Sequence, residues 1–226
     1  MNPLELITFD DTGFESQGDI NGTRVWYSPA NDGVGLYCYG VPPDIDCDLA
    51  DVQAVRNSYR QMASNAGLAI IEVETATVAG CIVIRTIIKA PQQPTGMTYL
   101  GSITLPFRDF SYVLKVQCAE QGITGLREAA VLDQLIASGT VTIIPEEGKI
   151  QGWMQDPYDP AIQAPLMRNR SEAIEYDETF PDHPLSRARQ VLNHIQKTIV
   201  IAPEVRSAPP FVGQTRNKPK SWWKRW

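Results

Sequence analysis

The sequence has few of the residues and motifs from which enzyme sites and metal centres are usually built. It contains only two histidines, His183 and His194, and its four cysteines form no C-x-x-C pair. It lacks the common nucleotide-binding, serine-hydrolase and zinc-protease motifs, namely G-x-x-x-x-G-K-[ST], G-x-G-x-x-G, G-x-S-x-G and H-E-x-x-H. The sequence therefore gives no motif evidence for the common enzyme classes. Scattered cysteines in a cytosolic protein are typical of reduced thiols that fill the core.

Long apolar runs are also absent. The most apolar segment, residues 81–88, is interrupted by Arg85 and is much shorter than the roughly 20 residues that cross a bilayer. The first eleven residues contain neither a basic residue nor the apolar centre of a secretory signal. We therefore expect a cytoplasmic protein without a membrane span.

Positive charge is scarce except at the end of the chain. The 226 residues carry a net charge of −6, and the last eleven contain five basic residues and no acid, so residues 1–215 carry −11. An acidic body argues against general nucleic-acid binding, which needs a basic face to neutralise phosphates. With 43% apolar residues, the chain is long enough for one globular domain with an extension.

The first 66 residues predict three strands and a helix. Alternating patterns with turn residues between them indicate short strands within residues 4–9, 24–28 and 35–41. Apolar residues at helical spacing then predict a helix over 49–66, with Asp48 as its N-cap.

Four longer strand-like runs follow, separated by short joins. Short joins favour an antiparallel meander, in which each strand pairs with the next. A second amphipathic helix is expected to start after Thr124 or Gly125 and to end at Gly139. The four runs cover residues 68–77, 81–89, 97–106 and 110–118.

This part of the chain resembles the PsbP/Mog-type fold. The resemblance lies in the strand Ile82-Val83-Ile84-Arg85-Thr86-Ile87-Ile88-Lys89, in the strand start Gly96-Met97-Thr98-Tyr99-Leu100-Gly101, and in the strand 112–118 that leads to the Thr124 helix. It covers about residues 4–138 and implies an α+β fold, an antiparallel β-sheet meander flanked by helices. Members of this fold class are mainly non-enzymatic binders: photosystem accessory proteins, a nuclear-transport regulator and bacterial secretion chaperones.

The acidic composition and the missing export signal favour the chaperone comparison. The resemblance therefore implies a non-enzymatic, protein-binding accessory protein of the bacterial cytosol, of adaptor, chaperone or immunity type. Fold analogy alone does not supply a function.

The composition changes after residue 139, where prolines repeatedly interrupt the pattern. A third helix is expected behind the turn at Phe180, with Asp182 as its cap and Pro184 in its first turn. We divide the chain into a PsbP/Mog-like domain (1–139), a Pro-rich extended arm (140–181), an amphipathic helix (182–201) and a Pro-rich, basic, Trp-rich tail (202–226).

The tail holds the strongest candidates for partner binding. Aromatic rings beside cations can enter a membrane interface, stack on bases or dock into a groove on a protein. A short cationic segment on an acidic body binds polyanions weakly, so we expect a protein partner, no nucleic acid, and at most weak membrane contact. Folding of the tail back onto its own acidic domain stays an equal alternative. The candidate residues are Trp222, Trp223, Lys224, Arg225 and Trp226 in the tail and Trp153 in the arm.

An alternative function is that of an enzyme or a small-ligand-binding protein with a pocket between sheet and arm. Its candidate residues are Arg85, Tyr99, Asp182 and His183. The two histidines lie three turns apart on the expected helix, too far to share a metal ion, and we expect no metal and no cofactor.

Asp44, Asp46 and Asp48 have the spacing that begins a calcium loop. The later positions that need Gly and Glu hold Leu49 and Val55 instead. These acids are better explained by the start of the first helix, whose positive dipole end they favour.

Overall fold

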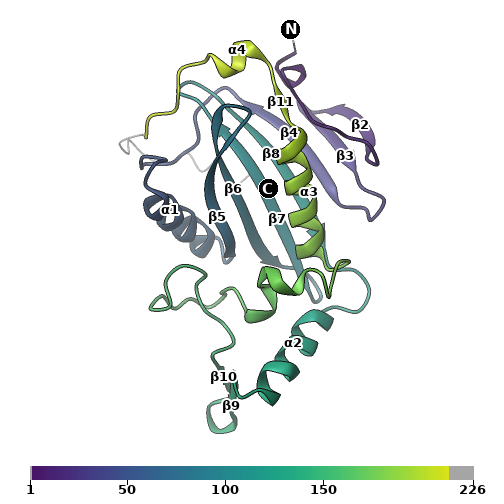
Figure 1. Cartoon of the computed structure of the whole chain (residues 1–226), viewed down its shortest axis with the longest axis vertical. Coiled ribbons are helices and arrows are strands. Elements are labelled where there is room, and N and C mark those ends of the chain that lie inside the picture. Colours follow the sequence, from purple (N-terminus) through teal and green to yellow (C-terminus); the bar gives the residue numbers. More distant parts are fainter. Residues whose placement is uncertain (1, 214–226) are drawn as a thin grey trace.

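The computed structural model describes residues 2–213. A seven-stranded antiparallel sheet with the strand order β2-β3-β4-β8-β7-β6-β5 forms the centre of the molecule (Figure 1). Two pairs of short strands accompany it: β1 (Ile7–Thr8) with β11 (Val200–Ile201), and β9 (Thr142–Ile144) with β10 (Lys149–Gln151). The central strands are β2 (Glu15–Ile20), β3 (Thr23–Tyr27), β4 (Gly33–Tyr39), β5 (Ala69–Val78), β6 (Cys81–Pro91), β7 (Met97–Pro106) and β8 (Ser111–Ala119).

The sheet confirms the predicted α+β fold with an antiparallel meander. Strands β5 to β8 pair consecutively, with Thr86 opposite Ser102 and Ser102 opposite Lys115. The helices are α1 (Val52–Asn65), α2 (Leu126–Ala137), α3 (Pro184–Thr198) and α4 (Pro203–Arg206), and four short 3-10 turns occur at Pro3–Glu5, Pro145–Glu147, Arg170–Glu172 and Ile174–Tyr176.

At the N-terminal end one strand was missed, and the predicted start of the first helix was wrong. Strand β2 was not predicted, because its six residues are all exposed and show no apolar alternation. Helix α1 begins at Val52 rather than at residue 49, because Asp51 is the N-cap and accepts from the Ala54 N–H at 3.0 Å. The Asp48 carboxylate instead accepts from the Ala50 N–H at 2.9 Å in the preceding turn.

Helices α1 and α3 cover opposite faces of the sheet. Helix α3 lies on β7 and β8, where Leu185, Leu192 and Ile195 join the main apolar core (Figure 1). Helix α1 packs on β5 through Val55 and Tyr59, in a second core. The third helix predicted from the sequence is therefore an integral layer of the domain, although it follows the boundary drawn at residue 139.

Gly101 marks a close approach of α3 to the sheet. A Cβ atom at this position would lie 2.8 Å from Cδ1 and 3.1 Å from Cγ of Leu192. We expect Gly101→Ala to lower the free energy of unfolding by about 1–3 kcal/mol through overpacking, measured by urea denaturation. Gly33→Ala is the matched control, because its Cβ would meet only Tyr27 at 3.7 Å. Equal stability of the two variants would contradict a tight contact at Gly101.

Residues 120–181 form a projection at one end of the sheet, which we call the lobe (Figure 1). It contains α2 and the arm, whose first part is the β9–β10 hairpin. A separate apolar cluster of Val131, Val141 and Trp153 forms its centre. Among the helices of residues 2–213, none has the length and apolarity of a membrane-spanning segment.

Candidate functional site

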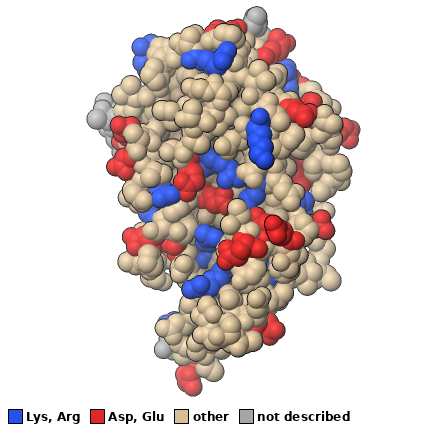
Figure 2. All heavy atoms as spheres, in the orientation of Figure 1, with Lys and Arg blue, Asp and Glu red and all other residues tan. Residues whose placement is uncertain are grey.

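An open cleft of about 430 Å³ lies where the lobe joins the sheet. It is bounded by the loop after β8, the start of α2 and the segment that leads into α3. Charged side chains of both signs gather around this junction (Figure 2). Ile123 and Leu126 line the cleft and are 77% and 60% exposed, and Phe180 lies beside them. Glu120 and His183 supply polar groups to the same cleft.

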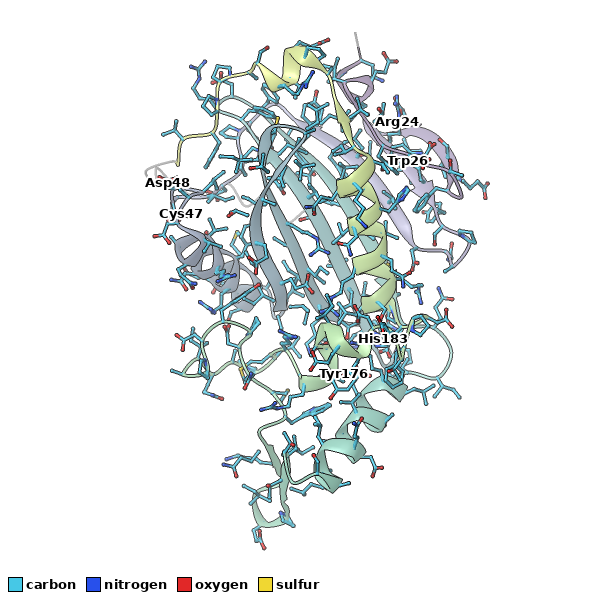
Figure 3. All side chains as sticks on the ribbon, in the orientation of Figure 1. Arg24, Trp26, Cys47, Asp48, Tyr176 and His183 are labelled. Carbon is cyan, nitrogen blue, oxygen red and sulfur yellow. The ribbon has the colours of Figure 1, made fainter. Side chains whose placement is uncertain are left out.

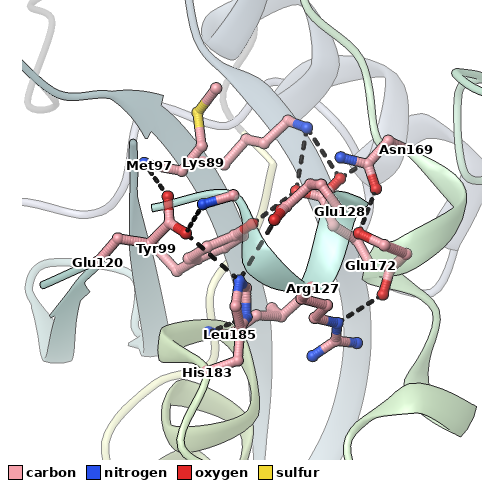
Figure 4. A network of polar contacts seen from close by, with 12 residues as sticks. Lys89, Met97, Tyr99, Glu120, Arg127, Glu128, Asn169, Glu172, His183 and Leu185 are labelled. Atoms are coloured by element: carbon pink, nitrogen blue, oxygen red, sulfur yellow. Dashed lines mark hydrogen bonds and ion pairs between the residues drawn. The ribbon is translucent and has the colours of Figure 1, made fainter. Parts of the chain in front are cut away.

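The Glu120 carboxylate is held by backbone hydrogen bonds. Oε2 accepts from the Met97 N–H at 2.7 Å, and Oε1 accepts from the Gly125 N–H at 2.9 Å (Figure 4). Gly125 precedes α2 with φ +76°, a conformation that glycine adopts without strain. The side chain is only 7% exposed, so the carboxylate is both fixed and largely buried.

His183 is the N-cap of α3 and lies at the lobe end of that helix (Figure 3). Its Nδ1 accepts from the Leu185 N–H at 3.3 Å. Burial, and after it the charges of Arg127, Arg187 and Arg189, lowers the pKa of His183 to about 3, so the ring is neutral near pH 7. A backbone N–H can only donate, which places the single ring proton on Nε2.

The Nε2 atom of His183 faces two carboxylates. It lies 3.9 Å from Oε1 of Glu120 and 3.8 Å from Oε1 of Glu128, beyond hydrogen-bond distance (Figure 4). Nε2 and Oε2 of Glu128 are buried atoms with no hydrogen-bond partner. Burial, and after it the carboxylates of Glu120 and Glu172, raises the pKa of Glu128. The three side chains therefore converge without satisfying one another.

The convergence of Glu120, Glu128 and His183 has the composition of a metal site, with ligand atoms within 4.8 Å of one another. A histidine that binds a metal normally donates its second ring N–H to an acceptor. In His183 the second nitrogen accepts instead, so Nε2 presents a proton rather than a lone pair. As placed, these residues do not form a set of metal ligands.

A buried ion pair lies directly beside this group. Lys89 Nζ contacts the two oxygens of Glu172 at 3.0 and 2.8 Å, and the two side chains are 2% and 0% exposed. The Tyr99 hydroxyl donates to Oε1 of Glu172 at 2.8 Å, and the Asn169 N–H donates to Oε2 at 2.6 Å. The Tyr99 ring also meets the His183 ring edge-on, with centroids 5.5 Å apart.

A chain of ion pairs continues from the lobe to the sheet. Asp177 accepts from Arg127 at 3.0 Å and from Arg189 at 2.8 Å. Arg189 also reaches Glu72 at 2.5 Å, and Glu72 contacts Arg85 at 2.8 Å. The arginines of these ion pairs are thus neutralised by Asp177 and Glu72. Glu120 and Glu128 take no part in these ion pairs.

The structure brings together some of the predicted pocket residues. Tyr99 and His183 are in contact, and Asp182 lines the cleft with an exposed side chain. Arg85 does not line the cleft and belongs to the ion-pair chain. The prediction that Asp182 caps the third helix was wrong, because His183 is the N-cap.

Glu120, Glu128 and Glu172 were not predicted as site residues. A charged residue on an otherwise apolar face is the sequence signal that points to this region. Lys89 follows Val83 and Ile87 along one face of β6, and Arg127 lies in the first turn of α2.

The predicted partner-binding residues fall into two groups. Trp153 is 8% exposed and packs in the lobe's own apolar cluster, so its ring is not available at the surface. Trp222, Trp223, Lys224, Arg225 and Trp226 lie outside the described residues, and their role stays a prediction.

The antiparallel sheet with helices on both faces is the α+β architecture that the sequence resemblance implies. Similar solved structures include the Ran-binding protein Mog1p of Saccharomyces cerevisiae, with a TM-score of 0.44 and 9% identity over 88% of this chain and 93% of that one. They also include cyanobacterial PsbP (CyanoP) of Synechocystis sp. PCC 6803, with a TM-score of 0.34 and 14% identity over 58% of this chain and 88% of that one. No protein-family model and no curated protein matches the chain. Likeness at this level says nothing about function.

Proposed function

We propose that the protein is a non-enzymatic accessory protein that binds a segment of a partner protein in the cleft. The observation that carries this proposal is the exposure of Ile123 and Leu126 at the cleft, at 77% and 60%. Exposed aliphatic side chains beside a concave surface are typical of interaction sites, because covering them removes apolar area from water. Phe180 adds an aromatic surface of the kind that supplies binding energy at interfaces.

The groups next to the cleft support binding rather than catalysis. Glu172 accepts hydrogen bonds from Lys89, Tyr99 and the Asn169 N–H, and Asp177 accepts from Arg127 and Arg189. Acids held in this way are fixed parts of the fold and have few free lone pairs for substrate. The more specific form of the proposal, a chaperone- or immunity-type adaptor of the bacterial cytosol, rests on the sequence resemblance.

A small-molecule ligand is the second candidate. A cleft of about 430 Å³ lies within the range of roughly 300–1,000 Å³ that small-molecule sites occupy. This alternative predicts that the protein binds a small molecule saturably, and that the binding is still observed with a lysate from which all proteins have been removed.

Affinity capture with matched variants tests the proposal. We expect the wild-type chain to retain a protein from native lysate and Ile123→Asp/Leu126→Asp to lose it by about tenfold or more, because a carboxylate in an apolar contact stays unpaired. Val200→Asp is the control, since Val200 is 62% exposed on β11 at a distance in the fold from the cleft.

Equal capture by the wild-type chain and the cleft variant would overturn binding at this cleft. A version that ends at Val212 shows whether the tail is needed. Capture of no protein by any version would refute the protein-binding function.

A further inference from the structure

We propose that another pocket, formed within the lobe, binds a phosphate group through the side chains of Arg168 and Arg170. This pocket has a volume of about 200 Å³, and none of the residues that line it lines the cleft. Its size is below the roughly 300–1,000 Å³ of sites for drug-sized ligands, so it suits one small anion or one charged group. The assignment does not depend on the proposed function of the cleft.

The backbone of the arm places the two arginines on one side of the chain. The segment around Asn169 is extended, with φ −97° and ψ 167°, and forms an antiparallel bridge with Met154. The Arg170 N–H donates to the Trp153 carbonyl at 3.0 Å in the same pairing. Side chains two positions apart in an extended segment point to the same side. Arg168 and Arg170 therefore share one face, and both line the pocket.

These two arginines lack the carboxylate partner that is usual for arginine in this protein. Among the arginines of residues 2–213, all others except Arg206 form an ion pair with a carboxylate. Arg206 is exposed, whereas Arg168 and Arg170 are partly buried. Two like charges that share a face repel each other, and partial burial adds a desolvation cost. An anion that contacts both arginines would offset both effects.

Backbone carbonyls hold both guanidinium groups and leave most of their donors unused. Nε of Arg170 donates to the Gly152 carbonyl at 2.6 Å, and Nη2 of Arg168 donates to the Glu172 carbonyl at 3.4 Å. A guanidinium group has five N–H donors, so the others are available to an oxyanion. Because these contacts restrain the side chains before a ligand binds, less conformational entropy is lost on binding.

A phosphate group suits two guanidinium groups better than a carboxylate does. A single guanidinium fork satisfies the two oxygens of a carboxylate. A phosphate monoester has three terminal oxygens and a charge of about −1.5 to −2 at pH 7, so it can accept from two guanidinium groups at once. Tyr176 also lines the pocket and has a hydroxyl that can donate a further hydrogen bond.

Calorimetric titration of the full chain at pH 7.5, in a buffer without phosphate, tests the assignment. The probes are sodium phosphate and Nα-acetyl-phosphoserine methylamide. We expect saturable binding, and we expect Arg168→Gln/Arg170→Gln to weaken it about tenfold or more, since charged hydrogen bonds are lost. Arg206→Gln is the matched control, because it removes an exposed arginine that also lacks a carboxylate partner. It should change the affinity by less than about twofold.

A second variant gives a test that does not depend on the stability of the arginine variants. Glu175 is the acid among the residues that line the pocket, and its side chain is exposed. Glu175→Gln preserves size and removes a negative charge near the bound anion. We expect it to tighten phosphate binding about twofold or more, because like charges repel. An unchanged affinity would place the anion outside this pocket.

The probes distinguish the sources of the phosphate group. Tighter binding of the phosphoserine probe would assign the pocket to a phosphorylated side chain, and tighter binding of sodium phosphate would assign it to free phosphate. Sodium acetate that binds as tightly as phosphate would overturn the phosphate assignment. An equal loss of binding in Arg206→Gln would show general attraction of anions and overturn the site, as would the absence of saturable binding. None of these results affects protein capture at the cleft, so the two proposals fail separately.

Discussion

A Lys89→Met variant is expected to lose about 3–5 kcal/mol of unfolding free energy, the largest effect of any single substitution that we predict. Lys89 and Glu172 are 2% and 0% exposed, and among the described residues Lys89 supplies the only cation in an ion pair with the Glu172 carboxylate. Methionine fills a similar volume, so the loss reports the charge that is left behind rather than a cavity. Urea denaturation followed by circular dichroism measures it.

The double variant Lys89→Met/Glu172→Gln is the matched control. Glutamine preserves the size of the side chain and an acceptor for Tyr99 but carries no charge, so we expect it to recover a large part of the stability. A double variant that is as unstable as Lys89→Met would show that packing, and not an unpaired carboxylate, causes the loss. Single-variant stability within about 1 kcal/mol of wild type would contradict a buried ion pair.

Acid is expected to destabilise the protein through His183. The pKa of His183 is about 3 in the folded chain and about 6.5 when unfolded, so the unfolded chain binds more protons between these values. The contribution of the neutral His183 ring to the free energy of unfolding is therefore complete above pH 6.5, and it is lost as the pH falls toward 3. Between pH 7 and pH 4.5 the shift corresponds to roughly 2–3 kcal/mol.

His183→Asn isolates this contribution. Asparagine is a good N-cap residue, so α3 keeps its first-turn hydrogen bond while the titrating ring is removed. The acids that do not approach His183 are unchanged in the variant, so their titration cancels in the comparison, and only Glu120 and Glu128 lose a neighbour. We expect urea denaturation at several pH values to give curves for wild type and variant that approach each other as the pH falls below 6.5. Parallel curves would show that His183 titrates normally in the fold.

The sheet and its helices were largely predictable because their signals are local. The strands β5 to β8 have alternating or continuous apolar runs with short joins, and each pairs with its neighbour in sequence. Strand β2 lacks such a signal, since Glu15–Ile20 is exposed throughout. The shift of the α1 cap from Asp48 to Asp51 reflects two aspartates that can both accept a backbone N–H, and local sequence does not rank them.

The site was less predictable because its contacts join distant segments. Lys89 and Glu172 are 83 positions apart, and Arg189 and Glu72 are 117 apart. Periodicity identifies a charged residue on an apolar face, but it does not identify the acid that meets it. His183 was a candidate, whereas its partners Glu120 and Glu128 follow from the tertiary structure alone.

The position of α3 also has a consequence for the order in which the protein can fold. The helix covers β7 and β8, yet the entire lobe separates it from β8 along the chain. During synthesis, which proceeds from the N-terminus, the strands are complete before α3 leaves the ribosome. One apolar face of the sheet, with Tyr112, Leu114 and Val116, is therefore exposed until the last third of the chain is made. Completion of the main core therefore waits for α3, and a chain that ends before Pro184 should leave this face of the sheet uncovered.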